Sequence, residues 1–451
     1  MFKKILSLTL ALLLAVSMIS VLASCKSKTG ETTDTTAKPA DENGDLNTSK
    51  IADVKIGLIM VGDESEGYTL AHMDGIKAAA KKVGLTDDQL KWEFNIGETS
   101  DCTAKANGLV AQGCQLVISN SYGHQEYMAE AAEEHEDVEF VAMTGDFAAI
   151  SGLDNLHNAF TRVYESRYVS GVVAGLKLQE LINDNKIEAK NKNGDNIKIG
   201  YVGAYPYAEV VSGYTAFYLG LKSVVSNVEM TVVYTDSWFS IEKEKAAAEK
   251  LMADGCVIIG QHADSTGAPA AVEAAHKAGT YTNVYSVGYN VSMLEAAPTV
   301  ALTSASNNWE VYYEYLFKAI INKVSGENVT IAANWAEGYN QNAVNITALG
   351  TACAAGTQAK VDETIAAIKA GTLKVFDVSK FTVGGAHITE NKFDLSYRDW
   401  ANGGVVVYQG DTVETLKTEK GITYVDESTF RSAPYFELRI DGITEDATHI
   451  Q

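Results

Sequence analysis

The sequence predicts an α/β protein with two similar lobes, each a doubly wound parallel sheet, followed by a β-rich tail. The first observation is a near repeat: VKIG at 54–57 returns as IKIG at 197–200, and GCQLVI at 113–118 returns as GCVII at 255–259, at almost the same offset. The second is that, in both copies, short apolar runs alternate with segments of helical spacing. Two duplicated α/β lobes usually face each other across a cleft, where a small ligand binds.

The N-terminus is predicted to be a lipoprotein signal peptide covering residues 1–24. Two lysines precede the apolar run Ile5–Ala23, and the tetrad Leu-Ala-Ser-Cys ends at Cys25. An ordinary signal peptide or a membrane-spanning helix is the alternative. The tetrad resembles the bacterial lipobox, so we expect lipid on Cys25 to anchor the chain outside the cytoplasmic membrane.

Residues 25–50 are predicted to be a flexible tether because they contain almost no large apolar side chains. The formal net charge of −22 argues against nucleic acid as a partner and disfavours polyanions. The hydrophobic fraction of 46% is enough for two cores of ordinary domain size.

The first lobe is predicted to comprise residues 51–160 with 291–330. Val54–Val61 is a continuous apolar run, as expected of a strand buried on both faces. Thr69–Val83 carries apolar residues at helical spacing. The other elements expected are strands Trp92–Ile96, Leu116–Ser119 and Val138–Met143, and helices Ala104–Ala111 and Glu126–His135.

The second lobe is predicted to comprise residues 161–290 with 331–375. It begins with the helix Tyr164–Leu181, whose small residues, among them Gly171 and Gly175, permit close packing. The other elements expected are strands Ile197–Val202, Met230–Tyr234, Val257–Ile259 and Val284–Val287, and helices Thr215–Val225, Ile241–Ala253 and Ala270–Ala278.

Three crossings between the lobes are expected, which would form a hinge that bends but resists twisting. After Asn290 the pattern predicts a strand, the helix Trp309–Val324 and a strand near Val329–Trp335. The crossings are expected near Asn158–Arg162, Asn290–Val300 and Thr330–Ala336. Residues 376–451 read as a β-rich extension.

The ligand is expected at the carboxyl ends of the strands, as in other open parallel sheets. Most loops there place an aromatic residue beside a polar one. These aromatic residues are Tyr68, Tyr122, Tyr205, Trp238 and Trp309. Aromatic faces suit a flat ring, so the set favours a planar heterocycle over a bare sugar, amino acid or anion.

Several long segments together resemble one family. They include GDESEGYTLAHMDGI, FTRVYESRYVSGVVAG, KIGYVGAYPYAEVVSGYTAFYLG, VYTDSWFSIEKEKAAAEKL, GQHADSTG and LTSASNNW. Over roughly residues 51–345 the chain resembles the basic-membrane-protein (BMP) family of ABC-transporter substrate-binding lipoproteins, in its purine nucleoside or nucleobase-binding branch. The resemblance implies the type I periplasmic-binding-protein fold and delivery of the ligand to permease subunits in the membrane.

The resemblance also implies site residues. Tyr68 and Trp238 match ring-stacking positions. The turn Ser121, Tyr122 and Gly123 stands where the family usually has Ser-Phe-Gly, also at the ligand.

His262 and Asp264 match a His-Thr-Asp-Ser motif whose Asp hydrogen-bonds the ligand, with Ala263 in place of Thr. At Tyr289 and Asn290 the family commonly has Tyr-Asp. Asn donates as well as accepts, whereas an ionised Asp only accepts. A ribose often meets such an acceptor, so the choice between a nucleoside and a free base stays open.

No catalytic residue is predicted. His262, Asp264 and Ser265 are too close in one loop for a nucleophile relay, which is built from distant segments. We therefore expect a passive binding protein for import. The alternatives are a ligand-sensing surface receptor read by another partner, a protein for another small polar ligand such as a sugar, and an enzyme acting on nucleosides.

No metal or cofactor is predicted either. The acidic loop 62–68 lacks the spacing of an EF-hand. The cysteines show no zinc-like spacing, and whether they form disulfides stays open. They are Cys102, Cys114, Cys256 and Cys353.

Overall fold

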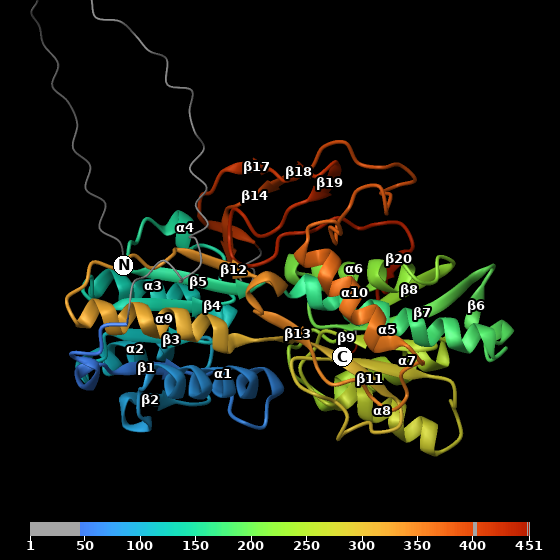
Figure 1. The fold of residues 1–451 in the computed structure, drawn as a ribbon, viewed down its shortest axis with the longest axis horizontal. Coiled ribbons are helices and arrows are strands. Elements are labelled where there is room, and N and C mark those ends of the chain that lie inside the picture. The colour runs from blue at the N-terminus through green and yellow to red at the C-terminus, as the bar shows by residue number, and fades with distance from the viewer. Residues whose placement is uncertain (1–45, 400–403, 449, 451) are drawn as a thin grey trace, which may run out of the picture. The chain divides into compact units, whose positions relative to one another are not determined.

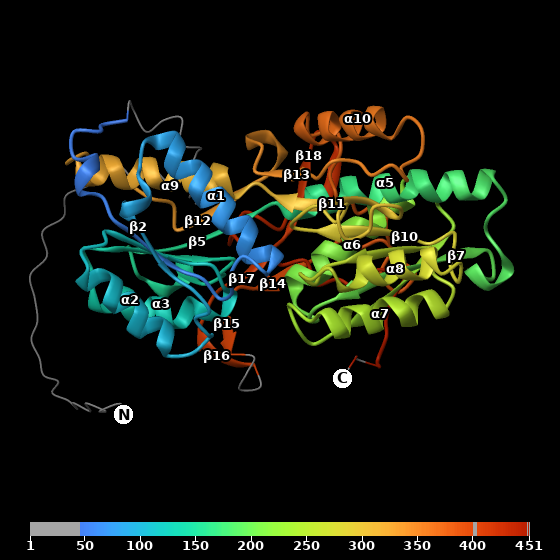
Figure 2. The ribbon, with the colours of Figure 1, turned by 90° about the horizontal axis from the view of Figure 1, so that it is seen from below.

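Two β-sheets organise the computed structural model, which describes residues 46–399, 404–448 and 450 (Figure 1). The leader and Cys25 lie outside the described residues. Helices cover both faces of each sheet (Figure 2). The predicted pair of parallel-sheet α/β lobes is therefore confirmed.

The first sheet has six parallel strands. In sheet order they are β12 (Asn334–Glu337), β5 (Leu156–Thr161), β4 (Glu139–Met143), β3 (Leu116–Ser119), β1 (Ile56–Ile59) and β2 (Leu90–Glu93). Its helices are α1 (Gly67–Val83), α2 (Asp101–Ala111), α3 (Gln125–Glu134), α4 (Ala148–Ser151) and α9 (Trp309–Val324). Figure 2 shows α1 and α9 on one face and α2 and α3 on the other. Successive side chains point to opposite faces, so Ile118 joins the core under α1 and α9 while Val117 joins the core under α2 and α3.

The second sheet is parallel except where β13 pairs with β11 and β6 with β7. In sheet order its strands are β13 (Val344–Ile346), β11 (Ala301–Asn307), β10 (Tyr285–Tyr289), β9 (Ile258–Gln261), β7 (Asn196–Gly203), β8 (Val228–Tyr234) and β20 (Ile443–Glu445), with β6 (Lys192–Asn193) beside β7. Its helices are α5 (Val163–Asn183), α6 (Ala208–Lys222), α7 (Ile241–Ala253), α8 (Gly267–Lys277) and α10 (Thr357–Lys369). Short 3₁₀ helices are η2 (Ile51–Asp53), η3 (Asp87–Gln89), η4 (Tyr122–His124), η5 (Ala189–Asn191) and η6 (Tyr339–Gln341).

Strand pairing corrects the lobe boundaries that the sequence predicts. β11 falls in the stretch 291–330 expected in the first lobe, yet it pairs with β10 and β13 of the second sheet. β12 falls in the stretch expected in the second lobe, yet it pairs with β5 of the first. The chain therefore crosses after β5, after β11 and after β12, and the last two crossings lie C-terminal to the predicted segments. Apolar patterning identifies a strand but not the sheet edge that it joins.

Residues 46–50, expected in the tether, lie against the C-terminal end of α9 instead. The Asn47 backbone N–H donates to Asn322 Oδ1 at 2.8 Å, and Ser325 Oγ donates to the Asn47 carbonyl at 2.8 Å. These backbone hydrogen bonds fix the segment despite its polar composition. Among the described residues, none of the helices has the length and apolar character needed to cross a bilayer.

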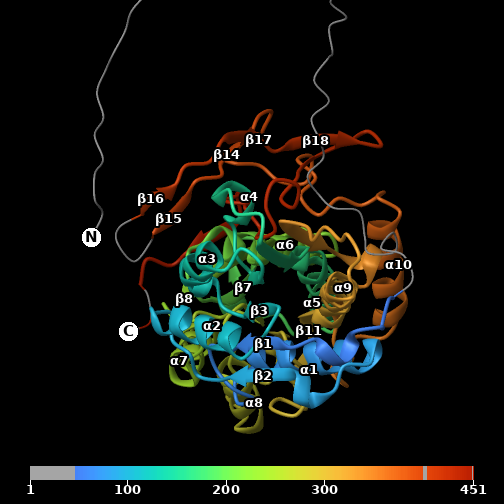
Figure 3. The ribbon, with the colours of Figure 1, turned by 90° about the vertical axis from the view of Figure 1, so that its left-hand side faces the viewer.

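The C-terminal extension, residues 376–451, contains short antiparallel ladders (Figure 3). They are β14 (Lys392–Asp394) with β17 (Thr412–Glu414), β15 (Tyr397–Asp399) with β16 (Val405–Tyr408), and β18 (Leu416–Glu419) with β19 (Ile422–Val425). Near its end, β20 pairs in parallel with β8 and so joins the second sheet.

Close contact between α5 and α6 confirms the packing role predicted for small residues in α5. A Cβ atom at Gly171 would lie 2.1 Å from the Phe217 carbonyl oxygen, and one at Gly175 would lie 2.9 Å from the Leu221 carbonyl oxygen. Only glycine lets the two backbones approach this closely.

We predict that Gly171→Ala lowers the free energy of unfolding by about 1–3 kcal/mol, because the added methyl group forces α5 away from α6. Gly108 in α2 is the control, since a Cβ atom there meets nothing within 4 Å. Gly108→Ala should be neutral or stabilise by up to about 1 kcal/mol through helix propensity. Urea unfolding measures the change in the free energy of unfolding for each variant. Equal changes for Gly171→Ala and Gly108→Ala would contradict this packing argument.

Candidate ligand-binding site

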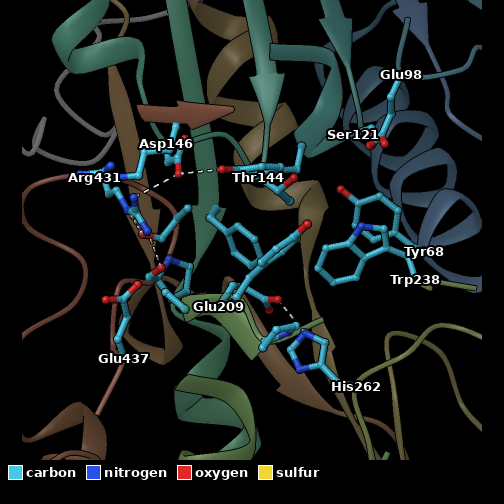
Figure 4. Close-up of a pocket in the computed structure, with 18 of the residues that line it drawn as sticks. Tyr68, Glu98, Ser121, Thr144, Asp146, Glu209, Trp238, His262, Arg431 and Glu437 are labelled. Carbon is cyan, nitrogen blue, oxygen red and sulfur yellow. Dashed lines mark hydrogen bonds and ion pairs between the residues drawn. The ribbon is translucent and has the colours of Figure 1, made fainter. Parts of the chain in front are cut away.

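A cavity of about 670 Å³ is lined by residues of both lobes and of the C-terminal extension (Figure 4). Its volume falls within the range of small-molecule sites. The contributions of the extension are Phe393, Asp394, Ser396, Arg398, Arg431, Ala433, Pro434 and Glu437.

The lobes supply the cavity from segments that follow strand ends, as the sequence predicts, although Tyr68 lies in the first turn of α1 and Tyr122 in η4 rather than in loops. Tyr68 follows β1, Ser121 and Tyr122 follow β3, Trp238 follows β8, and His262 follows β9. Within each sheet these strands are parallel, so their carboxyl ends open on the same edge.

Seven of the eleven predicted ligand-binding residues line the cavity. They are Tyr68, Ser121, Tyr122, Trp238, His262, Asp264 and Tyr289. The other four, Gly123, Tyr205, Asn290 and Trp309, are not among the lining residues. Each of these four contacts a lining residue or lies directly behind one.

Gly123 and Asn290 hold lining carboxylates in place. A Cβ atom at Gly123 would lie 2.3 Å from Glu98 Cδ, and the Gly123 backbone N–H donates to Glu98 Oε1 at 3.1 Å. Asn290 Nδ2 donates to Asp264 Oδ1 at 2.6 Å, while Asn290 Oδ1 accepts from Asn307 Nδ2 at 3.0 Å. Asn290 therefore orients Asp264, which is one of the lining residues.

Tyr205 and Trp309 support the cavity aromatics from behind. Tyr205 stacks on Tyr207 with ring centroids 5.1 Å apart and meets Trp238 edge-on at 5.2 Å. Trp309 is buried in the first core and stacks on His72 at 4.4 Å, and His72 meets Tyr68 edge-on at 4.5 Å. An aromatic residue at a strand–helix junction can turn toward the core, and Trp309 does so.

The cavity has an aromatic end and a charged end. In Figure 4, Tyr68 and Trp238 lie to the right, and Asp146 and Arg431 lie to the left. Tyr68 is fixed because its hydroxyl donates to the Asn120 carbonyl. An apolar ring and polar substituents would therefore find complementary surfaces at different places in the same cavity.

Carboxylates outnumber basic groups around the cavity. The acidic lining residues are Glu66, Glu98, Asp146, Glu209, Asp264, Asp394 and Glu437. The only basic ones among the described lining residues are Arg398, Arg431 and His262. Arg398 already pairs with Asp394 and Arg431 with Asp146. The lining therefore favours ligand groups that donate hydrogen bonds and disfavours anions.

Burial tunes two of these groups. His262 Nε2 lies 2.7 Å from Glu209 Oε2, and desolvation lowers the pKa of His262 despite that carboxylate. Desolvation, reinforced by Glu66, Glu244 and Glu209, raises the pKa of Asp264 well above its ordinary value. Asp264 therefore carries its proton more readily than an exposed aspartate, which lets it donate as well as accept.

Sequence reasoning missed several polar residues at the site. Glu209 lies in the first turn of α6 and Asp146 follows β4, but neither stands in a motif that singles it out. Arg167 is buried behind the cavity with its guanidinium 3.5 Å from the centre of the Tyr289 ring. Arg431 comes from the extension, where the sequence offers no signal.

Within the described part of the chain, no three His, Cys, Asp or Glu side chains are grouped as metal ligands. The cysteines at positions 102, 114, 256 and 353 are free.

Glu244 anchors the loop that carries His262 and Asp264. Its carboxylate accepts from the backbone N–H of Ser265 at 3.1 Å and of Ser240 at 3.2 Å. The side chain is fully buried, and desolvation raises its pKa from 4.5 to about 7.

We predict that Glu244 makes stability fall as pH rises between 4.5 and 7. In this window the folded protein keeps a proton that the unfolded chain has lost, so raising the pH favours unfolding. The stabilisation is complete below pH 4.5, and its loss amounts to at most about 3 kcal/mol. Glu244→Gln does not titrate, so the unfolding free energy of the native chain minus that of this variant should fall across the window. A difference that stays constant in urea titrations would contradict the raised pKa.

The chain is similar to known proteins in sequence and in fold. Residues 54–370 match the family model Bmp, described as ABC transporter substrate-binding protein PnrA-like. A purine-binding protein of Brucella abortus is 31% identical over 271 residues, covering 59% of this chain and 69% of that protein. A putative ABC transporter glucose-binding protein of Haloferax volcanii is 29% identical over 248 residues, covering 55% and 56%. A nucleoside-binding protein of Lactococcus lactis is 23% identical over 255 residues, covering 56% and 64%.

Solved structures of ABC-transporter solute-binding proteins share the fold. One from Conexibacter woesei has a TM-score of 0.55 at 19% identity and covers 71% of this chain and 98% of its own. One from Aeropyrum pernix has a TM-score of 0.56 at 14% identity and covers 74% and 94%. The two parallel-sheet lobes thus have the type I periplasmic-binding-protein fold that the resemblance implies.

Proposed function

Because the chain belongs to the Bmp family of PnrA-like ABC-transporter substrate-binding proteins, we propose that it binds a purine nucleoside or nucleobase for import. The family consists of substrate-binding proteins that work outside the cytoplasm with permease subunits, which confirms the prediction that this chain is not an enzyme. We also propose that lipid on Cys25 anchors the chain to the cell membrane.

The main support for a purine ligand is the aromatic end of the cavity. Trp238 and Tyr68 line it, and Trp238 is braced edge-on by Tyr205. Aromatic faces bind flat heterocycles, and stacking on a nucleic-acid base is worth roughly 1–3 kcal/mol. The neighbouring Asp264, His262 and Ser121 offer donors and acceptors to the edge of such a ring. Relatives described as purine-binding and nucleoside-binding support the same ligand class.

A sugar is the second candidate. The observation in its favour is the excess of carboxylates around the cavity, because carboxylates accept hydrogen bonds from hydroxyl groups. The relative described as a putative glucose-binding protein points the same way. A free sugar would leave the aromatic end of the cavity without a planar ring.

We predict that purine nucleosides or bases raise the melting temperature of the purified protein, whereas glucose and adenosine monophosphate do not. The acidic lining repels a phosphate group, so the nucleotide should fail where adenosine succeeds. A thermal-shift screen of adenosine, guanosine, inosine, their bases, glucose and the nucleotide checks this. A clear shift with glucose and none with any purine would overturn the proposal in favour of the second candidate.

We predict that Trp238→Ala weakens purine binding by about 1–3 kcal/mol, because the ring loses its stacking surface. Phe239→Ala is the matched control, since Phe239 is the next residue, is exposed and is not among the lining residues. Isothermal titration should give an unchanged dissociation constant for the control. Equal affinities for both variants would assign Trp238 a structural role only.

A further inference from the structure

The C-terminal extension begins and ends in the second lobe. Near its start and near its end, Phe376 and Phe436 stack with ring centroids 4.3 Å apart, and both belong to an apolar core of that lobe. Further along, β20 pairs in parallel with β8, and Glu445 accepts from the hydroxyls of Tyr214 at 2.6 Å and Tyr234 at 2.8 Å. A shared core and a backbone ladder therefore fix the extension to the second lobe.

Between these points the extension reaches the first lobe, first through the β15–β16 hairpin. Tyr397 and Tyr408 of the hairpin both stack on Phe147, each with ring centroids 4.7 Å from it. Phe147 is fully buried, and Tyr397 belongs to the first-lobe core under α2 and α3. Stacked aromatic rings attract each other and bury a large apolar area.

The extension reaches the first lobe a second time at Arg431 and Ser432. Arg431 Nη1 donates to Asp146 Oδ2 at 3.0 Å, and both charged side chains are buried. Ser432 Oγ donates to the Gly145 carbonyl at 3.0 Å, and the Ser432 backbone N–H donates to Asn334 Oδ1 at 3.2 Å. The chain then returns to the second lobe, so the extension is fastened to both lobes (Figure 1).

The two attachments differ in kind. On the first lobe, the hairpin, Arg431 and Ser432 all contact residues 145–147, which lie between β4 and α4. We call these contacts the latch. They are ring stacks, hydrogen bonds and one buried ion pair, whose desolvation offsets much of its attraction. Parting β20 from β8 would instead break a sheet, so the latch is the attachment that gives way when the lobes separate.

The extension also covers the cavity between the lobes. Phe393, Asp394, Pro434 and Glu437 are among the residues that line it. The latch contacts join protein atoms to protein atoms, so they hold with or without a ligand. Separation of the lobes breaks the latch and carries the extension away with the second lobe.

We propose that the C-terminal extension is a releasable strap, which holds the two lobes closed over the cavity until its latch on residues 145–147 opens. The extension lies beyond residues 54–370, which match the family model. It thus adds a fastening to the three chain crossings between the lobes, and the lobes open only as often as the latch releases. This inference is independent of which ligand the cavity binds.

Modification of a cysteine placed in the cavity tests the latch without any ligand. Ser121 lines the cavity from the first lobe, is only 8% exposed and lies away from Asp146 and Arg431 (Figure 4). In the Ser121→Cys protein, fluorescein maleimide should react at this position in proportion to the fraction of molecules with separated lobes. Peptide mass spectrometry gives the rate for each cysteine separately.

Adding Tyr408→Ala to this protein should speed modification at position 121 about tenfold or more, because one of the two rings on Phe147 is lost. Ser432→Ala removes the hydrogen bond to Gly145 and should also speed it. Tyr408→Phe keeps the ring and should restore the slow rate. Val407→Ala is the matched control, since Val407 is the preceding residue of the hairpin and is exposed.

Native buried cysteines separate lobe opening from partial unfolding. Cys102 and Cys114 lie in the first lobe and Cys256 lies in the second, and their rates should stay unchanged in every variant. Equal rates at position 121 for Tyr408→Ala and Val407→Ala would overturn the latch, as would an acceleration that Cys102 and Cys114 share. Rapid modification in the Ser121→Cys protein itself would also overturn it, because the lobes would then already be open. None of these results bears on purine binding, which the thermal-shift screen decides.

Discussion

The site depends on the parallel direction of the strands within each sheet. Because β1, β3 and β4 run the same way, the loops after them all open at one edge of the first sheet, and β7, β8 and β9 do the same in the second. Residues far apart in the chain are thereby gathered around one cavity. The helices and apolar cores hold this arrangement, and the loops remain free to vary in chemistry.

The charge balance of the cavity limits what it can hold. Its arginines are already paired with aspartates, so the remaining carboxylates face the ligand largely as acceptors. A neutral ligand rich in N–H and O–H groups satisfies them, and a phosphate does not. Asn290 and Glu244 fix Asp264 and its loop, so the acceptors are in place before a ligand arrives.

Local patterns were enough to predict the two parallel-sheet lobes and most of the aromatic end. Trp238 and Tyr68 could be found because loops after buried strands are readable in the sequence. The charged end could not, since Asp146 and Arg431 are 285 residues apart and no periodicity links them. Patterns also do not say whether an aromatic side chain faces the cleft or the core, which is why Trp309 was expected at the ligand.

The most direct measurement is a crystal structure of the protein with a purine nucleoside bound. The account predicts the purine base in the cavity, against Trp238 and Tyr68. A nucleoside found outside this cavity, or one bound inside it with no contact to Trp238 or Tyr68, would contradict the account.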